Sequence, residues 1–309
     1  MRLVTLEDVH AAAAAIAPHV VHTPLLPFDS GLWIKPESLQ PIGAFKQRGA
    51  VNALSRIPSE DRARGVVAYS SGNHAQAVAY AAKILGMPAA IVVPDNTPQI
   101  KIDATLAHGA EVFVVGITER ESRAYELVEE RKATLIPPFD HPDVIAGQGT
   151  IGLEICADLP DVATILVPVS GGGLISGVAT AVKALRPNVR VIGVEPELAG
   201  DAAASFTAGE QVHWDAHDRA RTSADGLRAE PSELTWAHIR EYVDDIVTVS
   251  EDEIRDAVRQ IARRTRIVSE TSGAVPVAAY LNRDLPAGPA VAIVSGGNIE
   301  PSLLASILG

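Results

Sequence analysis

The 309-residue chain contains one cysteine, and only 4% of its residues are aromatic. No internal disulfide can form, which is compatible with a reducing compartment. Cys156 lies in the apolar helical pattern GLEICADL, so we interpret it as a buried core thiol rather than a nucleophile. Hydrophobic residues make up 47% of the chain. The core is therefore expected to be aliphatic and rich in alanine, as in a soluble α/β protein.

Basic residues are also few, with 26 Lys and Arg against 38 Asp and Glu, for a net charge of −12. This charge argues against a nucleic-acid partner. The run AAAAAIA at 11–17 follows two acidic residues and is too short to span a bilayer. We recognise neither a secretory signal nor a transmembrane segment. The sequence thus predicts a cytoplasmic protein with no membrane partner.

Short apolar, β-branched runs alternate with Ala-rich helical patterns along the whole chain. Such an alternation indicates parallel strands covered by helices on both faces. The predicted strands form two series. The first lies at 65–70, 89–94, 110–116 and 133–138, and the second lies at 163–170, 189–196, 245–250 and 290–297.

The two series are separated near Pro137 to Pro142, which predicts two α/β lobes. The stretch 201–235 is the least regular and is expected to be a lid, a loop or an oligomer contact. Ser70, Ser170 and Ser295 each stand at the carboxyl end of a predicted strand. Because parallel sheets bind ligands beyond these ends, we expect a site between the lobes.

Lys46 is the most informative residue. It lies between Gly43 and Gly49 in the segment KPESLQPIGAFKQRGAVN. A lone lysine is usually a solvated surface charge, but these apolar, glycine-containing neighbours are a poor surface face. Both burial and the nearby Arg48 would lower the pKa of Lys46. Its amine could then form a Schiff base with a carbonyl group.

Three turns that carry serine and glycine could hold anionic groups of a ligand. SSGNH at 70–74 offers amides and hydroxyls to a carboxylate, and the three glycines of SGGGL at 170–174 let amides converge on a phosphate. Each could instead be an ordinary cap or turn. One lysine with two such turns suits a phosphate-bearing aldehyde such as pyridoxal 5'-phosphate. In the third turn, SGGN at 295–298, Ser295 could reach a pyridine nitrogen without holding it protonated, which favours elimination over a long-lived carbanion.

The loop EPELAGD could hold a cation. Glu195, Glu197 and Asp201 offer oxygen ligands at a short spacing, which suits Mg²⁺ or Ca²⁺. A solvated acidic loop is the alternative. The nine histidines show no metal-binding spacing such as HExxH.

In this order the elements resemble the threonine/serine dehydratase and serine racemase family of fold-type II pyridoxal-phosphate enzymes. The resemblance covers nearly the whole chain and rests on motifs that include PESLQPIGAFKQRGA, SSGNHAQAVAYAAK, GQGTIGLEI, VPVSGGGLISG, ADGLR and VSGGN. It implies a two-lobed α/β fold similar to the tryptophan synthase β chain. The resemblance implies a large cofactor-binding domain at 1–55 and 143–309. It also implies a small mobile domain at 65–142, joined through a hinge at 56–64.

The resemblance also implies roles for individual residues. Lys46 would carry pyridoxal phosphate, and Ser71 would be the second acid/base of a racemase. Further cofactor contacts would come from Phe45, Asn73 (to the ring hydroxyl), Ser170, Gly171, Gly172, Gly173 and Leu174 (around the phosphate), and Ser295 (at the ring nitrogen). The substrate carboxylate would be held by Ser70, Ser71, Asn73 and His74. A divalent cation would be held by Glu195, the Ala199 carbonyl and Asp201.

Three positions depart from the family pattern. Ser170 stands where many relatives have glycine, so a phosphate contact could come from its hydroxyl, and Ala44 replaces a frequent serine. Ala229 stands where racemases have serine, which weakens the racemase interpretation. We expect a dimeric ammonia-lyase acting on a β-hydroxy amino acid such as L-threonine or L-serine. A serine racemase, a 3-hydroxyaspartate ammonia-lyase and a non-enzymatic pyridoxal-phosphate-binding protein are the alternatives.

Overall fold

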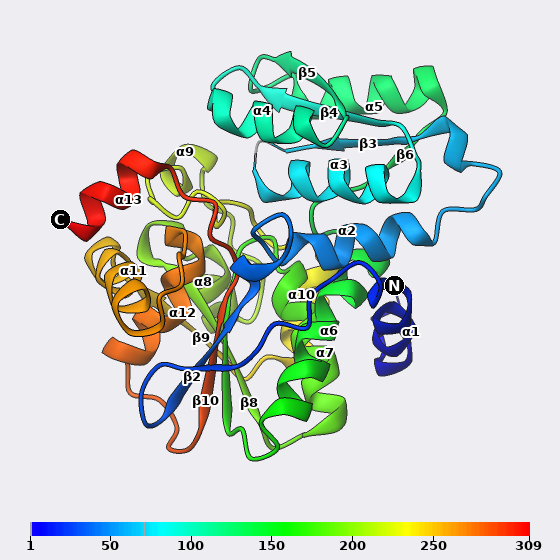
Figure 1. The fold of residues 1–309 in the computed structure, drawn as a ribbon. Helices are drawn as coiled ribbons and strands as arrows, with labels where there is room; N and C mark the ends of the chain where they lie inside the picture. Colours follow the sequence, from blue (N-terminus) through cyan, green and yellow to red (C-terminus); the bar gives the residue numbers. More distant parts are fainter. Residues whose placement is uncertain (1, 71) are drawn as a thin grey trace.

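The computed structural model describes residues 2–70 and 72–309 and contains two sheets flanked by helices (Figure 1). The larger sheet has the strand order β1-β2-β10-β7-β8-β9. Its pairs are parallel except for β1 with β2. Its strands are β1 (Leu26–Pro27), β2 (Leu32–Pro36), β7 (Thr164–Pro168), β8 (Arg190–Pro196), β9 (Asp245–Val249) and β10 (Ala290–Val294).

The smaller sheet has the order β5-β4-β3-β6 and is parallel throughout. Its strands are β3 (Val66–Tyr69), β4 (Ala89–Pro94), β5 (Glu111–Val115) and β6 (Thr134–Leu135). All eight predicted strands therefore form, in two sheets that correspond to the two predicted series. The run at 133–138 is shortened to two residues, since Pro137 and Pro138 have no N–H to give to a ladder.

β1 and β2 are not among the predicted strands. β2 is short, contains Lys35 and ends at Pro36, so it lacks the apolar run that marked the other strands. It nevertheless pairs in parallel with β10, and its Leu32 and Ile34 are fully buried. This strand leads into the segment that carries Lys46.

Helices cover both faces of each sheet. They are α1 (Leu6–Ile16), α2 (Lys46–Ser55), α3 (Asn73–Leu85), α4 (Gln99–Ala107), α5 (Arg120–Arg131), α6 (Pro142–Asp158), α7 (Gly173–Leu185), α8 (Asp201–Ala208), α9 (Ala216–Arg219), α10 (Glu233–Tyr242), α11 (Glu251–Thr265), α12 (Thr271–Asn282) and α13 (Pro301–Leu308). The irregular stretch 201–235 holds α8, the short α9 and long loops. Within the described ranges, none of these helices is both long and apolar enough to cross a membrane.

The core is aliphatic, as predicted. Along β7, Ile165 and Val167 pack with α6 and α7, whereas Leu166 packs on the opposite face with α11 and α12. Alternate residues of this strand thus enter two separate cores, as expected for a sheet buried on both faces. Cys156 is buried in the first of these cores. Helix α2 lies between the two sheets in Figure 1 and packs against both α3 and α6. The domain boundaries and the hinge at 56–64 stay a prediction.

Candidate active site

A cavity of about 590 Å³ lies where the two sheets face each other across α2. It is found beyond the carboxyl ends of β3, β7 and β10, as expected of parallel sheets. The described residues predicted for cofactor or substrate all line it, namely Phe45, Lys46, Ser70, Asn73, His74, Ser170, Gly171, Gly172, Gly173, Leu174 and Ser295. Ser71, the predicted second acid/base, lies outside the described residues.

The segment before Lys46 is fixed to the turn after β10. The Phe45 N–H donates to the Ser295 carbonyl at 3.0 Å, and the Gly297 N–H donates to the Gly43 carbonyl at 2.9 Å. Gly43 has a φ of +73°, a conformation that favours glycine. These contacts bring Lys46, the first residue of α2, beside Ser295 although 249 positions separate them in the chain.

The Lys46 amine is suited to react with a carbonyl group. Its Nζ donates to the Pro138 carbonyl at 2.6 Å and lies 5.2 Å from the centre of the Phe45 ring. Burial lowers the pKa of Lys46 from 10.5 to about 8. A substantial fraction of the amine is therefore neutral and nucleophilic slightly above neutral pH.

The predicted effect of Arg48 on Lys46 is wrong, because Arg48 faces a different set of partners. Its fully buried guanidinium is 2.8 Å from Glu37 and 2.7 Å from Glu154. Burial opposes its charge, yet these two carboxylates raise the pKa of Arg48 far above its ordinary value. The arginine thus anchors α2 to the turn that follows β2 and to α6, and burial alone lowers the pKa of Lys46.

The glycines at 171–173 leave room for an anion at the start of α7. A side chain on Gly171 would collide with the Phe139 ring, and Gly172 has a φ of +83°. Since α7 begins at Gly173, the amides of its first turn have no intrahelical acceptor. Free amides at the positive end of a helix fit a phosphate group.

The Ser170 hydroxyl, expected to reach the phosphate, is directed elsewhere. It accepts from the Ala229 N–H at 3.0 Å and donates to the Ala229 carbonyl at 3.3 Å. Ser170 thereby holds the loop of the ADGLR motif beside the cavity. In this structure the Ser170 hydroxyl is engaged by Ala229, whereas the amides of the first turn of α7 are the donors available to an anion.

The turn before α3 presents Asn73 and a neutral histidine. The Asn73 amide donates to Glu270 at 2.8 Å and accepts from Asn298 at 2.8 Å. His74 Nε2 lies 2.8 Å from the Ile136 carbonyl. Burial, followed by the charge of Lys46, lowers the pKa of His74 to about 3, so this ring is uncharged at neutral pH. It can hold a substrate by hydrogen bonding but not by charge.

Several ionisable groups of the cavity were not predicted, among them Glu270, Asp225 and Lys101. Glu270 is buried, and its pKa is raised to about 8, chiefly by burial and then by Asp225. Asp225 in turn pairs with Lys101 of α4 at 2.6 Å, which links the two sheets' layers across the cavity. Asp225 lies within the recognised ADGLR motif, but nothing in the local sequence distinguishes Glu270 from an ordinary helix-start glutamate.

The acidic loop after β8 contains two buried carboxyl groups. Glu195 accepts the Ala203 N–H at 2.8 Å through Oε2. Its Oε1 and the Asp201 Oδ2 are buried without a hydrogen-bond partner. Burial raises the pKa of Asp201 to about 6, and burial together with Asp201 raises the pKa of Glu195 well above its ordinary value. Two such unpartnered oxygens fit a divalent cation.

The other acidic residue of that loop, Glu197, does not join them. It is exposed and lies 3.9 Å from Arg283. No group of three or more His, Cys, Asp or Glu side chains suited to a metal occurs in the described ranges. A cation at Glu195 and Asp201 would thus need main-chain or water ligands, such as the Ala199 carbonyl predicted above.

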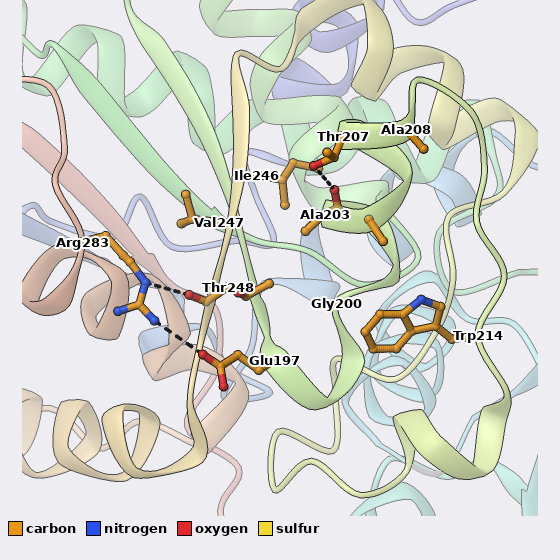
Figure 2. Close-up of a pocket in the computed structure, with 11 residues that line it drawn as sticks. Glu197, Gly200, Ala203, Thr207, Ala208, Trp214, Ile246, Val247, Thr248 and Arg283 are labelled. Carbon is orange, nitrogen blue, oxygen red and sulfur yellow. Dashed lines mark hydrogen bonds and ion pairs between the residues drawn. The ribbon is translucent and has the colours of Figure 1, made fainter.

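A second cavity of about 680 Å³ is lined mainly by residues of α8 and β9 (Figure 2). Figure 2 shows Trp214 and Arg283 at opposite sides of this cavity. Arg283 is held by Glu253 at 2.8 Å and by the Thr248 carbonyl at 2.9 Å, so its positive charge is balanced by a carboxylate. The described lining residues include no lysine, cysteine or serine. The Lys46 cavity is consequently the better candidate for chemistry.

Comparisons with known proteins show the family of the chain. The model of the family described as "Pyridoxal-phosphate dependent enzyme" matches residues 16–296. The chain is 44% identical to an L-threonine ammonia-lyase of Thermotoga maritima, over 99% of this chain and 78% of the relative. It is 42% identical to a serine racemase of Oryza sativa, over 96% of this chain and 92% of the relative. The crystal structure of a threonine deaminase from the organism abbreviated T.th. superposes with a TM-score of 0.91 at 44% identity, over 96% of this chain and 99% of that one.

Proposed function

Because this chain belongs to the pyridoxal-phosphate dependent enzyme family, we propose that it is an ammonia-lyase that converts L-threonine or L-serine into a 2-oxo acid and ammonia. The observation that carries the proposal is the amine of Lys46, with its lowered pKa, in a cavity that is also lined by the backbone at the start of α7. The threonine ammonia-lyase and threonine deaminase relatives support this substrate class.

Residues that line the cavity could hold each part of the cofactor. The amides of Gly171 to Leu174 would hold the phosphate, Asn73 the ring hydroxyl and Ser295 the ring nitrogen. When bound, pyridoxal phosphate supplies an electron sink for the carbon that loses its proton. Lys46, released as a free amine, is placed to take the α-proton of the substrate. Because the Ser295 hydroxyl is neutral, it would not hold the ring nitrogen protonated, which would favour elimination of the β-hydroxyl.

An assay panel tests the proposed reaction. L-threonine, L-serine, threo-3-hydroxyaspartate and a larger hydroxy amino acid are incubated with the enzyme, and ammonia and 2-oxo acid are quantified. We expect equal amounts of the two products from L-threonine or L-serine, because each elimination releases one of each. Ammonia and 2-oxo acid from 3-hydroxyaspartate alone would move the assignment to that alternative.

Racemisation is the second candidate function, favoured by the similarity to serine racemases and by the sequence position of Ser71. Ser71→Ala should abolish racemisation while L-substrate elimination continues through Lys46. If Ser71 also holds the substrate carboxylate, kcat/KM for elimination should fall about tenfold to a hundredfold. Chiral chromatography and Cα deuterium exchange measure the two reactions separately. A wild type that yields mainly D-amino acid would replace the lyase assignment.

We also propose that Glu195, Asp201 and the Ala199 carbonyl hold Mg²⁺ or Ca²⁺. Support comes from the unpartnered oxygens of the two carboxyl groups and from their raised pKa values. A cation would satisfy both oxygens and cancel the repulsion between the two charges.

Removal of the cation should make stability depend on pH. The pKa of Asp201 is raised from 3.8 to about 6, so the folded state binds its proton more tightly than the unfolded state does. Stability without cation is then highest below about pH 4 as far as this group is concerned, and falls as pH rises to about 6. Melting temperatures with EDTA or excess Mg²⁺ should diverge across this window, and Asp201→Asn should not respond. Glu197→Gln is the control that should keep the response of the melting temperature to EDTA and Mg²⁺. If the wild type does not respond to the chelator and Asp201→Ala is fully active, the loop is a solvated acidic loop that holds no cation.

A homodimer in the cytoplasm completes the proposal. The exposed apolar side chains of Leu39 and Val268 belong to segments that flank Gly297, and a second copy could cover them. The small domain, at 65–142, would move on the 56–64 hinge to close the cavity over an amino-acid substrate.

A further inference from the structure

The side chains of Asn298, Asn73 and Glu270 form a continuous hydrogen-bonded chain along the Lys46 cavity. Asn298 Nδ2 donates to Asn73 Oδ1 at 2.8 Å, and Asn73 Nδ2 donates to Glu270 Oε1 at 2.8 Å. The three residues belong to the turn after β10, the start of α3 and the start of α12. These hydrogen bonds thus connect three elements that meet at the candidate active site.

This arrangement determines which way the Asn73 amide faces. An asparagine side chain has one oxygen acceptor and two N–H donors. In Asn73 the oxygen accepts from Asn298 and one N–H donates to Glu270. No other residue that the structure describes accepts from the second N–H, so this N–H is available to a ligand. A rotation of the amide by 180° would set oxygen against Glu270 and N–H against the Asn298 amide. Both neighbours oppose that rotation.

Glu270 is itself held as an acceptor. It is 5% exposed, and besides Asn73 it accepts the backbone N–H of Asn298. The charged groups that act on it from neighbouring elements are Asp225, which raises its pKa, and Lys101 of α4, which lowers it. Since burial raises the pKa of Glu270 to about 8, the carboxyl group is largely neutral at pH 7 and accepts through its carbonyl oxygen.

We propose that Glu270 is a positioning residue that, together with Asn298, orients the Asn73 amide so that its free N–H is presented to the ring oxygen of the cofactor. This inference rests on the proposed function, since it requires that pyridoxal phosphate occupy the Lys46 cavity. Glu270 transfers no proton in this role. It acts only through Asn73.

Two substitutions of Glu270 should differ in their effect on the affinity for pyridoxal phosphate. Glu270→Gln keeps a carbonyl acceptor and should leave the affinity for pyridoxal phosphate within about threefold of wild type. Glu270→Leu removes the acceptor and should weaken cofactor binding about tenfold, with a changed visible absorbance of the bound cofactor. Asn298→Ala frees the Asn73 oxygen and should act in the same direction. Affinity is measured by titrating apoenzyme with pyridoxal phosphate.

A double-mutant cycle tests whether Glu270 works through Asn73. In an Asn73→Ala background, Glu270→Leu should add less than about a twofold further loss of cofactor affinity, because no amide remains to be oriented. Glu253→Gln, at the partner of Arg283 outside the Lys46 cavity, is the control for a lost carboxylate and should leave the cofactor spectrum unchanged.

Three results would overturn the proposal. The first is an equal loss of cofactor affinity from Glu270→Leu in the wild-type and the Asn73→Ala background. The second is a Glu270→Gln variant that binds the cofactor as weakly as Glu270→Leu. The third is a Glu270→Leu variant with the cofactor affinity of wild type. Melting curves of the apoenzymes show whether the variants are folded, and Asn298→Ala gives an independent answer if Glu270→Leu is not. If wild type binds no pyridoxal phosphate, the proposed function itself fails, and that result is read before any variant is compared.

Discussion

Replacing Lys46 with alanine is expected to lower kcat for L-threonine or L-serine by at least about 10³-fold, since one residue supplies both the covalent link and the base. The amine lies in the cavity with a pKa lowered to about 8 by burial. In the described lining the only other lysine is Lys101, which is paired with Asp225 at 2.6 Å. No neighbour is therefore placed to substitute for the lost amine.

The loss in Lys46→Ala should be chemical and not structural. Ammonia release is measured beside the melting temperature, which should change little because Lys46 makes one hydrogen bond to a carbonyl. A small primary amine added to the buffer should restore part of the activity. Lys132→Ala, at an exposed lysine, is the control that keeps full activity. A Lys46→Ala enzyme with activity near wild type would remove Lys46 from the mechanism.

Replacing Glu37 with leucine is expected to destabilise the fold by about 3–5 kcal/mol, the typical effect of breaking a buried ion pair. Glu37 and Arg48 are both fully buried, and the guanidinium bonds the carboxylate at 2.8 and 2.9 Å. Thr23 also donates to Glu37 at 2.8 Å. Leucine would leave these donors without their carboxylate acceptor in the interior, and Glu154 would be the remaining carboxylate partner of the arginine.

Urea unfolding measures this effect. Arg123→Ala is the matched surface control, since Arg123 pairs with exposed Glu126 and Glu130, and it should change the free energy of unfolding by less than about 1 kcal/mol. Burial works to raise the pKa of Glu37, but the charge and hydrogen bonds of Arg48 hold it below its ordinary value. The stabilisation is thus present at neutral pH and is lost as pH falls through that lowered pKa. A Glu37→Leu variant as stable as wild type would show that the ion pair contributes nothing net.

The lobes and the turns of the site were predictable because their signals are local. Each predicted strand is a short apolar run closed by proline or glycine, and burial on both faces of a parallel sheet requires such a run. The turns at Asn73 and Gly172 follow directly after strands, so the rule that ligands bind beyond strand carboxyl ends located them. Lys46 was found by its glycines, and Gly43 does have a positive φ.

Other features depend on contacts that the sequence does not display. Arg48 lies two residues after Lys46, yet as α2 turns, its side chain faces α6 and the turn that follows β2, and its partners come from 11 and 106 positions away. Glu270 meets Asn73 across 197 positions. Glu197 and Asp201 are close in sequence, but only Asp201 is buried beside Glu195. Which way a side chain points was decided by tertiary packing in all three cases.

Reduction of the enzyme with borohydride, followed by peptide mass mapping, tests the central claim most directly. The reagent fixes pyridoxal phosphate covalently to the lysine that carries it as a Schiff base. We predict a yellow protein that loses its colour on reduction and yields the cofactor mass on the one peptide that contains Lys46. A label on Lys101, Lys35 or any other lysine, or no label on a protein that turns over L-threonine, would contradict the assignment of this site.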